Sequence, residues 1–197
     1  MIFDITSSME FLKREANLDC WELFEPIFND PRFEVCSAAA KPGLHHYGKG
    51  GLVYHTAEVA MLCDVNNETM GNPIDERKLF AAAFYHDVGK MWDHVATNEE
   101  MTEWTGTTHK RNIHHISRSA LTFQKNVDRI TNRPDWLNEE GVDQILHAIL
   151  AHHGLREWGS PVAPNSKLAY LLHLCDSISA RLTDCETIDR VKEKENK

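Results

Sequence analysis

Apolar residues recur along most of this chain at a spacing of three and four residues. The segment 138–153 shows the pattern most clearly, because Val142, Ile145 and Ile149 fall on one face of a helix with about 3.6 residues per turn. By the same spacing we expect helices over 9–18, 53–65, 76–86, 114–127, 138–153 and 167–182. No segment alternates apolar and polar residues as a half-buried strand does. The pattern therefore predicts an all-α fold, a single helical bundle.

Capping and helix-breaking residues set the predicted helix boundaries. Ser7 and Ser8 are candidate N-caps of the first helix. Asp75 is expected to start the helix over 76–86, and Gly89 to end it. The polar segment 92–112 contains Gly106 and is predicted to be a loop or flap.

Length and composition predict one ordinary globular domain. The chain has 197 residues, of which 42% are hydrophobic and 26% charged, so it can bury a sizeable core. We expect accessory helices over 1–35, the principal domain over 36–185, and a charged tail over 186–197 that is solvated.

The charge balance restricts the partners. Lys and Arg total 21 against 30 Asp and Glu, which gives a net charge of −9. A surface that binds an extended nucleic-acid duplex needs a broad basic patch, so we do not expect one here. Small anionic molecules stay on the list of expected ligands, because bound metal ions can invert the local field. A short single-stranded nucleic-acid end stays on that list as well.

Cysteine usage and the N-terminus indicate a cytoplasmic protein. The five cysteines are odd in number and form no C-x-x-C pair, which favours reduced, buried thiols. The N-terminus carries Asp4 and Glu10 and lacks the pattern of a signal peptide. The longest apolar stretch, around 79–85, is too short to span a bilayer. The sequence leaves the oligomeric state open.

Twelve histidines are the one unusual feature of the composition. Many of the metal-capable residues fall near the ends of predicted helices, where a site built from several packed helices takes its ligands. They are His55, His86, Asp87, His114, His115, His152, His153, His173 and Asp176. Imidazole together with carboxylate suits first-row transition metals. Adjacent His86 and Asp87 can supply a nitrogen ligand and a bridging carboxylate, so we expect two divalent ions.

The order of these residues resembles a known signature. His55, then His86-Asp87, then Asp176 match the H…HD…D pattern of the HD superfamily of metal-dependent phosphohydrolases. The segment 86–90 resembles the HD-[IV]-G-K motif of that superfamily. The chain further resembles the HD domains of YhaM-type 3′-to-5′ exoribonucleases and of relaxase-associated proteins. That likeness spans 38–182 and includes Ala39-Ala40-Lys41, His45-His46-Tyr47, Gly50-Gly51-Leu52, His55-Thr56, the segment 149–154 and Gly159-Ser160-Pro161-Val162.

The resemblance implies a role for each matching residue. A first ion would be held by His55, His86, Asp87 and Asp176, and a second by Asp87, His115, His152 and His153. Asp87 would bridge the two ions, and a bridging hydroxide would attack phosphorus. Lys90 would contact a phosphate oxygen. His114 is the alternative to His115, which we prefer because it directly precedes Ile116, as in the usual His-Ile pair of the family. Mn, Fe, Co and Ni all suit this ligand set.

Further residues are candidates for binding the substrate. His45 and His46 either line the entrance or cap their loop. Arg111, in the basic run 109–111, either closes over an anion or forms a solvated turn. The three tryptophans of the predicted loops either stack a base or pack. They are Trp92, Trp104 and Trp158. His173 is expected to support a ligand or to pack.

Two departures from the related families limit the likeness. Gly51 stands four residues before His55, where some three-metal members have a glutamate, so a third metal is not expected. The YhaM-type enzymes also carry an N-terminal nucleic-acid-binding barrel, for which 197 residues leave no room.

The function that follows is a metal-dependent phosphodiesterase that cleaves a nucleotide phosphodiester. The substrate would be an oligonucleotide 3′ end or a cyclic nucleotide. The alternatives are a (deoxy)nucleotide phosphatase or triphosphohydrolase, a di-iron oxygenase and a non-catalytic nucleotide sensor. Product analysis, iron-dependent oxygen consumption and an Asp87→Ala variant would separate them.

Overall fold

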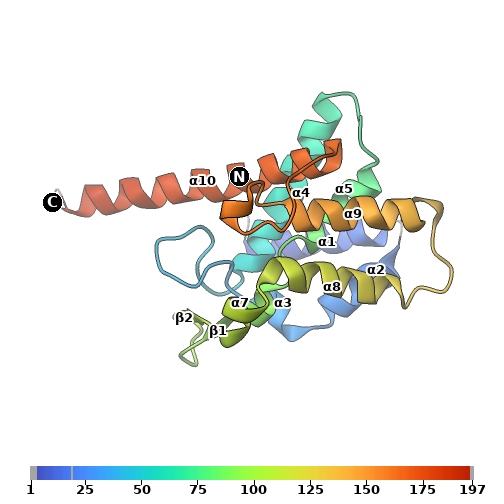
Figure 1. Cartoon of the computed structure of the whole chain (residues 1–197). Coiled ribbons are helices and arrows are strands. Elements are labelled where there is room, and N and C mark those ends of the chain that lie inside the picture. Colours follow the sequence, from blue (N-terminus) through green and yellow to red (C-terminus); the bar gives the residue numbers. More distant parts are fainter. Residues whose placement is uncertain (1–3, 19, 196–197) are drawn as a thin grey trace.

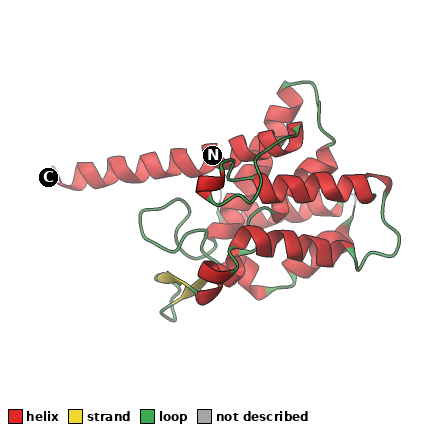
Figure 2. Ribbon diagram, viewed as in Figure 1, coloured by secondary structure: helices red, strands yellow, loops and turns green. Residues whose placement is uncertain are grey.

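The computed structural model describes residues 4–18 and 20–195, with the backbone alone from 183 onward. The regular secondary structure of the described part is helical apart from one short hairpin (Figure 1, Figure 2). The all-α prediction is confirmed. The elements in chain order are α1 (Ile5–Asn17), α2 (Trp21–Phe28), α3 (Pro31–Val35), α4 (Gly51–Thr69), α5 (Glu76–Tyr85), α6 (Lys90–Asp93), β1 (His94–Ala96), β2 (Trp104–Gly106), α7 (Thr108–Asn112), α8 (His115–Val127), η1 (Asp135–Leu137), α9 (Glu139–Ala151), η2 (Arg156–Trp158) and α10 (Lys167–Glu195).

Side-chain caps explain where the helices begin. Asp4, and neither Ser7 nor Ser8, caps α1, so that prediction was wrong. The Asp4 carboxylate accepts a hydrogen bond from the Ser7 backbone N–H at 2.8 Å, and the Ser7 hydroxyl bonds back to Asp4. The pair forms a capping box, which satisfies two backbone donors at once and is stronger than a lone serine cap. Asp75 caps α5, as predicted, by accepting from the N–H of Arg77.

A group of long helices forms the centre of the molecule. α4 packs against α5 and α10, α9 packs against α5, α8 and α10, and the N-terminal helices α1 and α2 cover α4 and α8 (Figure 1). Leu52, Phe84, Ile145 and Leu172 are completely buried where these helices meet. Burying each such side chain contributes roughly 1.5–3 kcal/mol. The predicted amphipathic faces thus point to one shared core.

The N-terminal helices share that core. Phe24 on α2 meets Phe84 on α5 edge to face, with ring centroids 5.0 Å apart. The Tyr85 hydroxyl donates to the Leu23 carbonyl and accepts from the Asn126 amide at 2.8 Å. One buried phenol therefore joins α2, α5 and α8.

The segment 92–112 is more regular than the predicted loop or flap. It contains the end of α6, the antiparallel strands β1 and β2 with His94 opposite Gly106, and α7. Strands of three residues are too short to show an alternating pattern in the sequence. Trp104 is 8% exposed, and its indole donates to the Met101 carbonyl, so it packs within the hairpin.

The last helix extends well past its predicted end at residue 182. α10 runs to Glu195 and projects from the helical group (Figure 1). The predicted solvated tail over 186–197 and Cys185 lie outside the described side chains. The other four cysteines are buried, namely Cys20, Cys36, Cys63 and Cys175. No helix in the described part of the chain is long and apolar enough to cross a membrane.

Candidate metal centre

The seven predicted ligands converge from five different helices or the turns beside them. His55 lies on α4 and Asp176 on α10, while His86 and Asp87 occupy the turn after α5. His115 is the first residue of α8, and His152 and His153 follow the last residue of α9. The N-terminal parts of α4 and α8, the C-terminal ends of α5 and α9, and the middle of α10 thus meet at one place.

The first group of ligands is closely spaced and buried. His55 Nε2 lies 3.2 Å from Asp87 Oδ2 and 3.1 Å from Asp176 Oδ1. His86 Nε2 lies 3.2 Å from His55 Nε2. The four candidate ligand atoms of this group all lie within 4.8 Å of one another. Two nitrogens and two carboxylate oxygens at this spacing suit one transition-metal ion.

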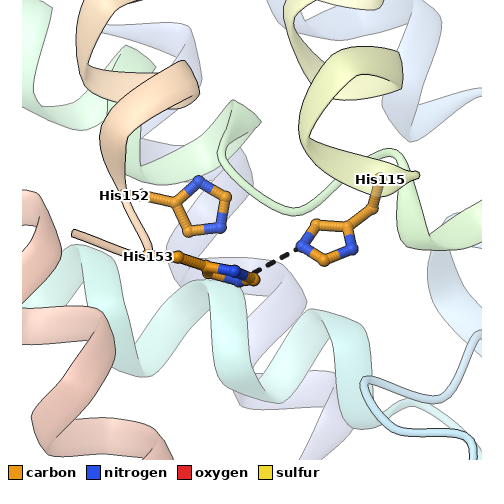
Figure 3. Close-up of side chains that lie close together, drawn as sticks. All are labelled: His115, His152 and His153. Carbon is orange, nitrogen blue, oxygen red and sulfur yellow. Dashed lines mark hydrogen bonds between the residues drawn. The ribbon is translucent and has the colours of Figure 1, made fainter. Parts of the chain in front are cut away.

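The second group consists of three histidines (Figure 3). His115 Nε2 and His153 Nε2 are 3.3 Å apart. Asp87 joins this group through its other oxygen, because Asp87 Oδ1 lies 3.4 Å from His115 Nε2 and 3.6 Å from His152 Nε2. Asp87 therefore presents one oxygen to each group, which is the geometry of a bridging carboxylate.

In three of the ligand histidines, a hydrogen bond at Nδ1 fixes which ring nitrogen carries the proton. Nδ1 of His86, His152 and His153 each lies 2.7 Å from a backbone carbonyl oxygen. A carbonyl only accepts, so Nδ1 carries the proton and Nε2 offers a lone pair to the centre. Asp87 Oδ1 and His152 Nε2 are also buried without a hydrogen-bond partner. Converging lone pairs and an unpartnered carboxylate oxygen fit divalent cations.

The electrostatics of Asp87, Asp176 and His153 agree with this assignment, whereas burial lowers the pKa of His55 but its hydrogen bonds with Asp176 and Asp87 raise that pKa overall. Burial raises the pKa of Asp87, but Lys90 and the adjacent histidines outweigh it and hold that pKa well below its usual range. Burial also raises the pKa of Asp176, and the hydrogen bond from His55 reverses this, so the net shift is downward. Burial lowers the pKa of His153 to about 4. Ionised carboxylates and neutral imidazoles are the forms that bind metal ions.

Comparison with known proteins agrees with the geometry. The HD domain family model matches residues 52–181. The chain belongs to the HD domain family. It is 30% identical over 159 residues to the 3′-5′ exoribonuclease YhaM of Bacillus velezensis, which is 79% of this chain and 46% of that protein. It is 29% identical over 149 residues to the YhaM of Bacillus subtilis, 75% of this chain and 44% of the relative. The chain thus spans just under half the length of these relatives, and no solved structure matches it.

Membership confirms the predicted family and supports the predicted enzyme class, a metal-dependent phosphohydrolase. The HD dipeptide of the family is His86-Asp87 here. Gly89, two residues after Asp87, allows the backbone of this turn to approach the backbone of His115 closely. A Cβ atom at Gly89 would lie 2.2 Å from the backbone oxygen of His115. Only glycine lets the turn of this HD domain pack directly against the start of α8.

Three groups outside the predicted ligand set orient the ligand histidines. Asp93 is fully buried, and its Oδ2 lies 3.3 Å from His115 Nδ1 and accepts from the His115 backbone N–H at 2.9 Å. On the other side, Ser179 Oγ lies 2.9 Å from His55 Nδ1 and donates to Glu58 Oε2 at 2.5 Å. Partners of this kind fix the ring orientation of metal-binding histidines.

The sequence gives a signal for two of these three groups. Glu58 follows His55 by three residues, and Ser179 follows Asp176 by three, so each shares a helix face with a ligand. Asp93 gives no such signal, because it acts on His115 from an element 22 residues away in the chain.

A cavity of about 390 Å³ opens beside the two groups. Lys90, His45 and His114 line it, as does Lys110 of the predicted basic run 109–111. The Lys90 ammonium lies 2.6 Å from Asp87 Oδ2. One end of the cavity therefore carries cationic side chains next to the candidate metal ligands.

Neither His46 nor Arg111 lies among the described residues that line this cavity. His46 Nε2 lies 3.1 Å from Glu58 Oε2, deep beside His55. Arg111 bonds weakly within its own helix, to the Thr108 hydroxyl. His173 Nδ1 donates to the His152 carbonyl at 2.8 Å, which agrees with a supporting role.

Proposed function

We propose that this HD domain is a phosphodiesterase that holds two divalent transition-metal ions and cleaves a nucleotide phosphodiester. The observation that carries the proposal is the orientation of Asp87. One of its oxygens faces His55 and His86, and the other faces His115 and His152. The relatives named as exoribonucleases support a nucleotide or short oligonucleotide as the substrate.

Two bound ions would supply an activated water and a clamp for the phosphoryl oxygens. The residues of the chain provide the setting for that chemistry. Lys90 is 7% exposed and lines the cavity, where its ammonium is available to a phosphate oxygen as well as to Asp87. Its fixed charge offsets the negative charge that a phosphodiester brings beside Asp87 and Asp176.

The proposed ligand set is the seven residues of the two groups. His55, His86, Asp87 and Asp176 would hold the first ion, and Asp87, His115, His152 and His153 the second. Mn, Fe, Co and Ni suit these ligands. At the substrate side we assign Lys90 and His45, which line the cavity; the predicted roles of His46 and Arg111 stay untested.

The test is hydrolysis by protein loaded with Mn, Co, Ni or Fe(II). We expect cleavage of bis-p-nitrophenyl phosphate and release of nucleoside monophosphates from a short RNA. His86→Ala should reduce both rates to background, because it removes one ligand of the first ion. His147→Ala is the matched control, since His147 accepts a bond from Asn165 on the outer side of α9.

Other products would point to another function. Release of inorganic phosphate or triphosphate from free nucleotides, with intact diesters, would favour the nucleotidase. Oxygen consumption that depends on iron would favour the di-iron oxygenase. An Asp87→Ala variant with unchanged biological activity would favour the nucleotide sensor.

A further inference from the structure

The turn after α9 brings one tryptophan to the edge of the candidate metal centre. The backbone carbonyl of Trp158 accepts the Nδ1 proton of His153 at 2.7 Å. The next residue, Gly159, has a left-handed backbone with a φ of 99°. A Cβ atom at Gly159 would lie within 4 Å of both His114 and His153. The position of Trp158 is therefore coupled to a candidate ligand by a direct hydrogen bond.

The side chain of Trp158 is available to a ligand. It is 51% exposed and lines the cavity beside the centre. Trp104 is buried in the hairpin, and the ring of Trp92 lies under the guanidinium groups of Arg32 and Arg118. Of the three loop tryptophans that the sequence singles out, Trp158 alone presents a large exposed ring to the cavity.

A guanidinium group accompanies this ring. Arg181 on α10 lines the same cavity, and its Cζ lies 5.9 Å from the centroid of the Trp158 ring. That distance is within the range of about 6 Å for a cation–π interaction, so the guanidinium lies beside the ring face. Among the side chains that the structure describes, no carboxylate pairs with Arg181. The guanidinium is thus available to an external anion.

The cations of the cavity contrast with the rest of the molecule. Lys90, Lys110 and Arg181 line it against one carboxylate, that of Asp176, while the whole chain carries a net charge of −9. A local concentration of positive charge in an acidic protein attracts an anionic ligand to that place. An aromatic ring beside such cations is the combination by which proteins bind single-stranded nucleic acids, stacking bases and pairing phosphates.

We propose that Trp158 and Arg181 form a subsite for the nucleotide next to the scissile phosphate. The base of that nucleotide stacks on the Trp158 indole, and Arg181 contacts a flanking phosphate. The inference rests on the proposed function and narrows its substrate to single strands that have a base and a phosphate beside the bond cleaved. Since every base has a π-face, this subsite does not select among base types.

The experiment compares a three-nucleotide RNA with a counterpart that lacks the base next to the scissile phosphate. The measured quantity is kcat/KM of Mn-loaded protein for each strand. Trp158→Ala should lower kcat/KM for the intact strand about tenfold, with a several-fold smaller loss for the abasic strand. Trp158→Phe should restore most of the difference. Leu155→Ala, in the same exposed turn, is the control and should leave both values unchanged.

Arg181→Ala should lower kcat/KM for both strands to a similar extent, because both carry the flanking phosphate. It should also weaken the dependence of kcat/KM on salt concentration. Equal losses on the two strands in Trp158→Ala would overturn the subsite, since they would mean that Trp158 acts only through His153. Unchanged values in both variants would overturn it as well.

Binding of a fluorescein-labelled trinucleotide, followed by anisotropy, keeps this proposal separate from the proposed function. If the wild-type protein binds the intact strand more tightly than the abasic one but hydrolyses neither, the proposed function fails and the subsite stands. If hydrolysis occurs without discrimination between the strands, the proposed function stands and the subsite fails.

Discussion

At the scale of single residues, the candidate centre depends on the groups behind its histidines. Asp93 and Glu58 fix His115 and His55 from the side away from the candidate ions, Asp93 directly and Glu58 through Ser179. Burial raises the pKa of Asp93, but its bonds with His115 and His109 lower that pKa to about 2, so it stays ionised.

We expect Asp93→Asn to weaken binding of the second ion by roughly 10–100-fold and to leave the first nearly unaffected. An amide can turn its NH₂ group toward His115 Nδ1 and then no longer holds the ring. Glu58→Gln should weaken binding of the first ion and leave binding of the second nearly unaffected. A titration with Mn²⁺ against a fluorescent chelator gives both affinities. Glu99→Gln, on the exposed part of the hairpin, is the control, and equal effects at both ions in either variant would contradict the assignment.

The candidate ligands could be proposed from the sequence because their types and their order along the chain are local features. Asp87 lies directly beside His86, so a carboxylate that bridges two metal ions can be proposed from two neighbouring residues. Which oxygen faces which group could not be inferred, because that depends on how α5, α8 and α9 pack. The sequence also could not show that, of the adjacent residues Lys110 and Arg111, only Lys110 lines the cavity.

At the scale of elements, the turn between α5 and α6 decides whether the two groups of ligands meet. It carries His86 and Asp87, and its Gly89 N–H donates to the Ser119 hydroxyl on α8 at 2.9 Å. The long helices could be predicted because each buries one face over several turns. The hairpin of β1 and β2 could not, because three residues are fewer than the alternation needs.

Gly89→Ala should destabilise the fold by about 1–3 kcal/mol, because the added Cβ meets the His115 backbone and forces the turn away from α8. Urea denaturation in the presence of EDTA measures this change without a contribution from bound metal. Gly106→Ala is the matched control, since its Cβ would meet only the flexible end of Lys110. A stability of Gly89→Ala equal to that of the control would show that the turn has more room than the structure indicates.

At the scale of the whole molecule, a buried histidine joins the hairpin to the rest of the fold. His94 is 6% exposed, its Nδ1 donates to the Ser37 carbonyl at 2.9 Å, and its Nε2 lies 3.1 Å from the Lys110 ammonium. Burial lowers the pKa of His94 to about 4, below the 6.5 of an exposed histidine. The unfolded chain therefore takes up this proton at a higher pH than the folded one.

The contribution of His94 to stability is present above pH 6.5 and is lost as the pH falls from there through 4. With EDTA present, we expect the urea midpoint of the protein to fall between pH 7 and pH 5, and to fall less in His94→Gln. For each protein, the urea midpoint at pH 5 is subtracted from the midpoint at pH 7. A loss of stability that is the same at both pH values then cancels. Identical pH dependence in the two proteins would contradict a neutral, buried His94.

The central claim is that two ions occupy the two groups of ligands that Asp87 joins. The most direct test is the transition-metal content per chain, measured by mass spectrometry on protein purified without a chelator or histidine tag. We expect about two ions in the wild-type protein and about one in His153→Ala, which keeps the first group complete. A single ion in the wild-type protein, or the same content in both proteins, would contradict the two-metal account.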